Sequence, residues 1–138
     1  MGKINWRRVL LGGLLAGVVI NAVETVVNSV ILKRQWQAAM EALGKSPQPG
    51  SMWIFIAVGF LLGLLAVWLY AAIRPRFGPG PKTALYAGLY VWALAYVITV
   101  MSSVPMGLMP NTLLLATTAV GLIEAPLGTI LGAWVYKE

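Results

Sequence analysis

The sequence predicts an all-α fold, a four-transmembrane-helix bundle with a short interfacial amphipathic helix after helix 1. Of the 138 residues, 59% are hydrophobic and 10% are charged, whereas a soluble domain carries about a quarter charged residues. Four apolar runs are long enough to cross the roughly 30 Å hydrocarbon layer of a bilayer, and none of them contains Lys or Arg. We therefore expect a single integral membrane domain over residues 1–138, with spans at about 9–32, 51–73, 83–104 and 111–136.

The first span contains a polar stripe. Its members lie at spacings of four, four, three and four, which places them on one side of a helix: Gly13, Gly17, Asn21, Glu24 and Asn28. Because no basic residue lies in the same span, Glu24 must face protein or water rather than lipid. We therefore expect this side of the helix to be buried against other helices.

The segment after the first span predicts the interfacial helix. Trp36, Met40 and Leu43 follow one another at i, i+4 and i+7, with polar residues at the other positions, so residues 33–43 form an amphipathic helix. Gly44 ends it, and the loop at 46–50 leads to the second span.

The second and third spans are joined by a basic segment with three prolines, residues 74–82, and we expect these prolines to prevent helix continuation. Gly59 and Gly63 form a small-residue step in the second span. One narrow side of the third span carries mostly small residues: Ala84, Gly88, Val91, Ala95, Thr99 and Ser102. The short link after it makes the third and fourth spans antiparallel neighbours.

The fourth span repeats the pattern of the first. One side carries Thr117, Gly121, Glu124, Gly128 and Gly132, at spacings of four, three, four and four. Small residues allow membrane helices to approach closely. Pro126 removes a backbone donor beside the acid, so a local kink is expected there.

The two buried acids have two interpretations. If spans one and four touch, the carboxyls share a proton or bond to Asn21, Asn28 or Thr117. The first interpretation is structural: neutral hydrogen bonds between helices that fix their register, worth about 1 kcal/mol each. The second is a proton- or cation-coupled transport site, since acids inside a membrane commonly serve one. Tyr86 and Tyr90 are further candidates for a bond to a carboxyl, with core packing as their alternative role.

Composition also excludes several function classes. Cysteine and histidine are absent, so the usual ligands of structural zinc, haem and iron–sulfur clusters are missing. We expect no catalytic residues, no metal and no cofactor. The net charge of +6 comes from residues beside the spans, which is typical of anchoring to anionic headgroups and not of nucleic-acid binding. Seven of the ten Lys and Arg residues would lie on the side of the termini, which predicts that both termini are cytoplasmic.

Three segments together carry a resemblance: residues 4–8 leading into Gly12 and Gly13, residues 35–44, and residues 69–83 with the Arg-Pro-Arg-Phe-Gly-Pro-Gly-Pro-Lys-Thr connector. On these segments the chain resembles a group of small bacterial inner-membrane proteins with four predicted helices, for which no activity is established. The resemblance implies a multi-pass protein of the bacterial inner (cytoplasmic) membrane. The chain is also superficially similar to small multidrug transporters, but that match stops at Glu24.

The leading hypothesis is a non-enzymatic membrane protein that acts by helix association, as a small accessory subunit of a complex or as a homo-oligomer. It rests on the number of glycine-lined helix faces. This number is larger than a single four-helix bundle readily uses for its own internal packing. Its partners would be the lipid bilayer and other membrane subunits or itself. The alternative is a small proton- or cation-coupled transporter that uses Glu24 and Glu124, and a fainter one is a lipid, pigment or quinone binder.

Overall fold

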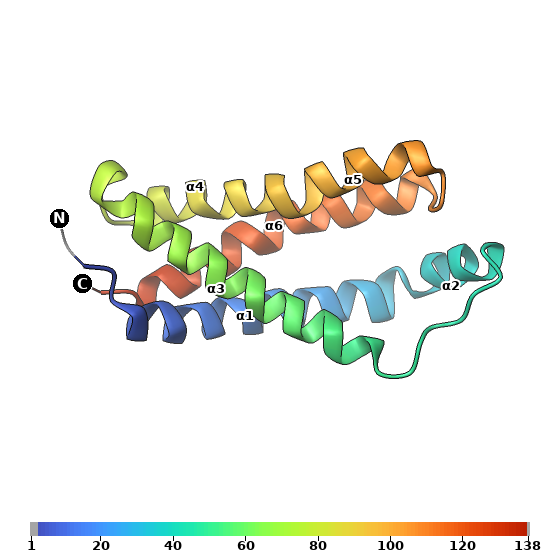
Figure 1. Ribbon diagram of the computed structural model, residues 1–138, viewed down its shortest axis with the longest axis horizontal. Helices are drawn as coiled ribbons and strands as arrows, with labels where there is room; N and C mark the ends of the chain where they lie inside the picture. The colour runs from blue at the N-terminus through green and yellow to red at the C-terminus, as the bar shows by residue number, and fades with distance from the viewer. Residues whose placement is uncertain (1–2, 138) are drawn as a thin grey trace.

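The computed structural model describes residues 3–137 and is built from helices (Figure 1). Their bounds are α1 Trp6–Val26, η1 Val27–Ile31, α2 Lys33–Ala42, α3 Ser51–Phe77, α4 Pro81–Trp92, η2 Ala93–Val97, α5 Ile98–Ser103, η3 Val104–Met106 and α6 Asn111–Val135. Four continuous helical stretches of 25 to 27 residues are long and apolar enough to span a membrane. The predicted fold class is confirmed, including the short helix α2 after the first span.

The core of the bundle lies where α1 and α6 cross their neighbours. Helix α1 packs against α3 and α6, and α4 packs along α6 and α3. Glycines bring the backbones together: a Cβ on Gly63 would lie 2.4 Å from Gly17 N, and a Cβ on Gly132 would lie 2.5 Å from Gly12 O. Both distances are shorter than any real Cβ contact, so these helices approach as closely as they do only because glycine is present.

The connector between the second and third spans differs from its prediction. Helix α3 continues through Pro75 to Phe77, although prolines at 74–82 were expected to end it earlier. Pro75 lies in the last turn, where the loss of one N–H costs one bond and the turn is closed by Gly78 N donating to Arg74 O at 2.8 Å. The helix ends at Gly78, whose φ of 82° is readily adopted by glycine.

The two ends of the described chain meet at one end of the bundle (Figure 1). Asn5 N donates to Tyr136 Oη at 3.2 Å, and Asn5 Nδ2 donates to Lys137 O at 3.2 Å. Tyr70 and Tyr136 stack edge to face with centroids 5.9 Å apart, and the Arg74 guanidinium lies 5.6 Å from the Tyr136 ring centroid. Gly80 N donates to Tyr70 Oη at 3.2 Å, so contacts link the N-terminal, C-terminal and 78–81 segments.

Two of the long helices contain a π-helical turn, η1 in the first and η2 in the third. A π turn holds one extra residue, so it rotates all later side chains by about 100° relative to an uninterrupted α-helix. Such turns are frequent at functional sites. Here η1 lies at the end of the first span, next to α2, and η2 lies in the middle of the third span.

Candidate functional site

The structure brings Glu24 and Glu124 together through the hydroxyl of Tyr96. The Tyr96 hydroxyl lies 3.4 Å from Glu24 Oε1 and makes a short hydrogen bond with Glu124 Oε1. The three residues come from α1, η2 and α6, so one oxygen joins three helices. Glu124 is 0% exposed. Two acids separated by 100 positions in the sequence therefore share one hydrogen-bonding partner inside the bundle.

The network continues from Glu24 toward α2. Asn28 Nδ2 makes a short bond to Glu24 Oε2 and a second one, at 3.0 Å, to Glu24 O. Asn28 Oδ1 accepts from Trp36 Nε1 at 2.8 Å. An unbroken chain of hydrogen bonds thus runs from Trp36 in the interfacial helix through Asn28, Glu24 and Tyr96 to Glu124.

Tyr96 is fixed by its own surroundings. A Cβ on Gly121 would lie 2.5 Å from Tyr96 Cδ1, so the ring lies against the bare backbone of α6 one turn before Glu124. One turn earlier in the third span, Trp92 Nε1 donates to Thr118 O at 2.8 Å. These contacts hold the third span against α6 and direct the Tyr96 hydroxyl at the carboxyls.

Counting hydrogens assigns the protonation state of the pair. The Tyr96 hydroxyl has one proton, so it donates to one carboxyl and accepts from the other. At least one carboxyl must therefore be protonated. Glu24 also accepts from Asn28 at Oε2. The two carboxyls therefore share a proton as a pair.

The bundle closes the site on the side of the termini. The side chains there are fully buried and packed: Ile20, Val67 and Thr129. The Thr129 hydroxyl donates to Ala125 O at 2.6 Å, within its own helix. The polar chain therefore leads only toward the opposite end of the bundle, as far as the described residues show.

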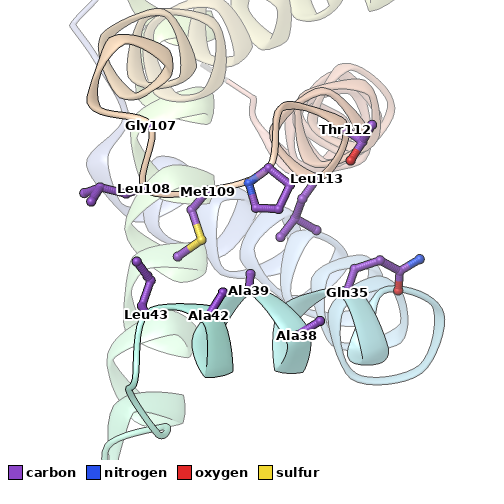
Figure 2. Close-up of a pocket in the computed structure, with 11 residues that line it drawn as sticks. Gln35, Ala38, Ala39, Ala42, Leu43, Gly107, Leu108, Met109, Thr112 and Leu113 are labelled. Atoms are coloured by element: carbon purple, nitrogen blue, oxygen red, sulfur yellow. The ribbon is translucent and has the colours of Figure 1, made fainter.

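At that opposite end, α2 lies across from the link between η3 and α6 (Figure 2). Leu32, Ala39 and Leu113 form a small apolar cluster, with Trp36 packed against it. Beside the cluster, between α2 and the link from η3 to α6, lies an open cavity of about 530 Å³. Figure 2 shows Met109 and Leu113 pointing from the link and α6 toward α2.

The other predicted polar residues lie outside this network. Asn21 Nδ2 donates to Gly17 O at 2.9 Å and to Ile56 O at 3.2 Å, so it links α1 to α3. The Thr117 hydroxyl lies 3.2 Å from Leu113 O and 3.0 Å from Leu114 O, in its own helix. The polar residues of the two predicted stripes therefore have different partners. Glu24, Asn28 and Glu124 belong to one hydrogen-bonded cluster, whereas Asn21 and Thr117 bond elsewhere.

The sequence suggested Tyr86 and Tyr90 as partners of a carboxyl, but the tyrosine that contacts Glu24 and Glu124 is Tyr96. Tyr86 packs edge to face on Phe77 and under the Lys82 ammonium, and Tyr90 is 57% exposed. The sequence analysis put Ala95 on the same side of the third span as Gly88 and Val91 because it assumed an uninterrupted α-helix. The π turn at 93–97 shifts the face by one residue, so Tyr96 points inward and Thr99 and Ser102 are exposed.

The predicted packing glycines all contact this same chain. Gly13 and Gly17 lie against Leu64 and Phe60 of α3, and Gly128 lies against α1. The same holds for the rest of the set: Gly59, Gly63, Gly121 and Gly132. The glycine faces are therefore used inside the bundle and give no argument for a partner. The association hypothesis stays a prediction that needs another observation.

No family model, curated protein or solved structure matches the chain.

Proposed function

We propose that this chain is a small proton-coupled transporter of the bacterial inner membrane, in which Glu24, Tyr96 and Glu124 bind the coupling proton. The single observation that carries the proposal is the Tyr96 hydroxyl between two carboxyls of different helices. The four apolar runs predicted from the sequence (9–32, 51–73, 83–104 and 111–136) contain no Lys or Arg to neutralise these acids. A site with two acids and one shared proton is suited to exchange that proton for another or for a cation.

Two features support transport over a purely structural pair. A structural hydrogen bond between helices needs one donor and one acceptor, whereas this cluster joins four polar side chains and ends at the interfacial helix α2. The two π turns, Val27–Ile31 and Ala93–Val97, carry Asn28 and Tyr96. Such turns are rare and are frequently found at functional sites.

The orientation belongs to the same proposal. Both termini and the second connector, with seven Lys and Arg residues, would lie in the cytoplasm, and α2 with three basic residues near it would lie at the outer face. Protons would then reach Glu24 from the outside and leave toward the cytoplasm after a rearrangement that opens the packing around Ile20 and Val67.

Proteoliposomes loaded with the pH dye pyranine test the proposal. A pH gradient is imposed, then Na⁺, K⁺ or tetramethylammonium is added outside, and a valinomycin-driven potential is applied in a separate experiment. We expect proton movement above that of empty liposomes in at least one condition. Glu124→Gln should abolish it, and Glu41→Gln, a change at an exposed acid of α2, should preserve it. Equal proton movement in the Glu124→Gln variant, or none in the unaltered protein, would contradict the proposal.

A further inference from the structure

We infer that the cavity between α2 and the link from η3 to α6 is a binding site for an uncharged single-chain amphiphile of the membrane, such as a monoacylglycerol or a long-chain alcohol. The inference goes beyond proton coupling and does not depend on it.

The cavity arises because α2 presents small side chains to the link. Ala38, Ala39 and Ala42 lie on one face of α2, and all three line the cavity. An alanine side chain ends at Cβ, so α2 lies across from Leu108 and Met109 without filling the space between them (Figure 2). The remaining cavity of about 530 Å³ is within the range of about 300–1,000 Å³ that is typical of ligand sites.

The size of the cavity fits one alkyl chain. A group the size of a water molecule takes about 30 Å³, so the cavity of about 530 Å³ holds roughly 17 groups of that size. The chain of a monoacylglycerol or a long-chain alcohol has about that many carbon atoms. A phospholipid carries two such chains and would need about twice the volume.

The lining of the cavity carries no charge. Lys33, Arg34 and Glu41 of α2 do not line it, and the link at 107–110 contains no ionisable residue. A charged group held against apolar side chains without a partner is costly. A phosphate or carboxylate head would find no opposite charge in the lining, so the ligand is uncharged.

Two polar side chains give the lining a polar end. Figure 2 shows Gln35 and Thr112 at one end of the lining and Leu43 and Leu108 at the other. An amide and a hydroxyl can each donate and accept hydrogen bonds. The hydroxyl head of the ligand would therefore bond to Gln35 and Thr112, and its chain would lie along the alanines toward the two leucines.

The cavity lies at the membrane surface, where an amphiphile in the bilayer can reach it. The third span ends at Met106 and the fourth begins at Asn111, so the link forms its wall at the end of both spans. The opposite wall is the amphipathic helix α2, and such helices lie at the boundary between head groups and acyl chains. Met109 contributes a flexible thioether side chain, which adapts to apolar ligands of irregular shape.

Photolabelling in nanodiscs of phosphatidylcholine tests the site. The probe is a monoacylglycerol with a diazirine in its chain; light releases N₂ and leaves a carbene that inserts into a neighbouring C–H or O–H bond. Mass spectrometry of peptides then locates the adducts. We expect adducts in residues 35–43 and 107–113 that are lost when unlabelled monooleoylglycerol is added in excess. Adducts around Phe55, which is 72% exposed, report contact with bulk lipid and should remain.

Larger side chains on α2 should close the site. Ala38→Leu combined with Ala42→Leu adds bulk at two exposed positions, and the adducts that compete with monooleoylglycerol should be lost. Ala57→Leu combined with Ala72→Leu makes the same change at two exposed alanines of α3 and should leave labelling unchanged. Thr112→Val keeps the shape of the side chain and removes its hydroxyl. It should raise the concentration of monooleoylglycerol that halves labelling about fivefold, the factor for one neutral hydrogen bond.

Several results would overturn the inference. Adducts in 35–43 and 107–113 that persist under competition would mean contact with bulk lipid only, and unchanged labelling after the α2 substitutions would place the ligand elsewhere. Equal competed labelling by a lysophosphatidic acid probe with the same chain would contradict the uncharged head. A dimeric native mass with both segments unlabelled would mean that a second copy fills the cavity. Because binding needs no proton gradient, each of these results leaves the outcome of the liposome test separate.

Discussion

Replacing Tyr96 with Phe removes the oxygen that joins the two carboxyls and leaves the ring against Gly121. The change deletes the bonds to Glu24 Oε1 and Glu124 Oε1. Hydrogen bonds to charged groups are worth about 1.5–3 kcal/mol, and measured bonds between membrane helices average about 0.6 kcal/mol with a maximum near 1.7. Glu124 is 0% exposed, so water cannot replace the lost hydroxyl. We therefore expect Tyr96→Phe to lower the free energy of unfolding by about 2 kcal/mol.

The assay is equilibrium unfolding in mixed micelles of dodecylmaltoside and SDS, followed by circular dichroism. Tyr90→Phe is the control, because it makes the same chemical change at a side chain that is 57% exposed. It should alter the free energy of unfolding by less than about 0.5 kcal/mol. A Tyr96→Phe variant as stable as the Tyr90→Phe control would refute the role of the hydroxyl as the link between three helices.

Three further predictions concern the surrounding packing. Gly63→Ala should lower the free energy of unfolding by about 2 to 3 kcal/mol, the upper range for overpacking. The added Cβ would lie 2.4 Å from Gly17 N, and a backbone atom in a packed helix cannot move aside as a flexible side chain can. The same micelle assay measures this loss. Asn21→Ala should cost about 1 kcal/mol through loss of the bond to Ile56 O, and an unchanged midpoint of unfolding would count against that bond. Leu113→Ala should loosen α2, since Leu113 is 2% exposed and anchors it, and trypsin should then cleave faster at the basic residues that begin α2; an unchanged cleavage rate would argue that α2 is held elsewhere.

The fold could be predicted because its signals are local. Each span is an apolar run with Lys or Arg near at least one end, and the interfacial helix follows from the spacing of Trp36, Met40 and Leu43. The end of α3 was misplaced because a proline in a last turn interrupts only one bond, and the position of that turn depends on Gly78. The presence of each helix could be predicted from composition, but the residue at which a helix ends depends on contacts within the folded chain.

The site was predicted only in part, since its acids are visible in the sequence and its geometry is not. Glu24 and Glu124 stand out because they are charged residues inside apolar runs. Tyr96 does not, because the π turn at 93–97 changes which residue faces inward. One signal was available: Gly121 lies three residues before Glu124, and a bare backbone beside an acid leaves room for one aromatic ring.

Infrared spectroscopy of the protein at neutral pH tests the shared proton most directly, because a protonated carboxyl has a C=O stretch separate from that of a carboxylate. Two of the four acidic residues, Glu24 and Glu124, lie inside the spans. We predict a protonated-carboxyl band that disappears when Glu24 and Glu124 are both replaced with Gln and remains in Glu41→Gln. Absence of the band from the unaltered protein, or its persistence in the double variant, would contradict a proton shared by the pair.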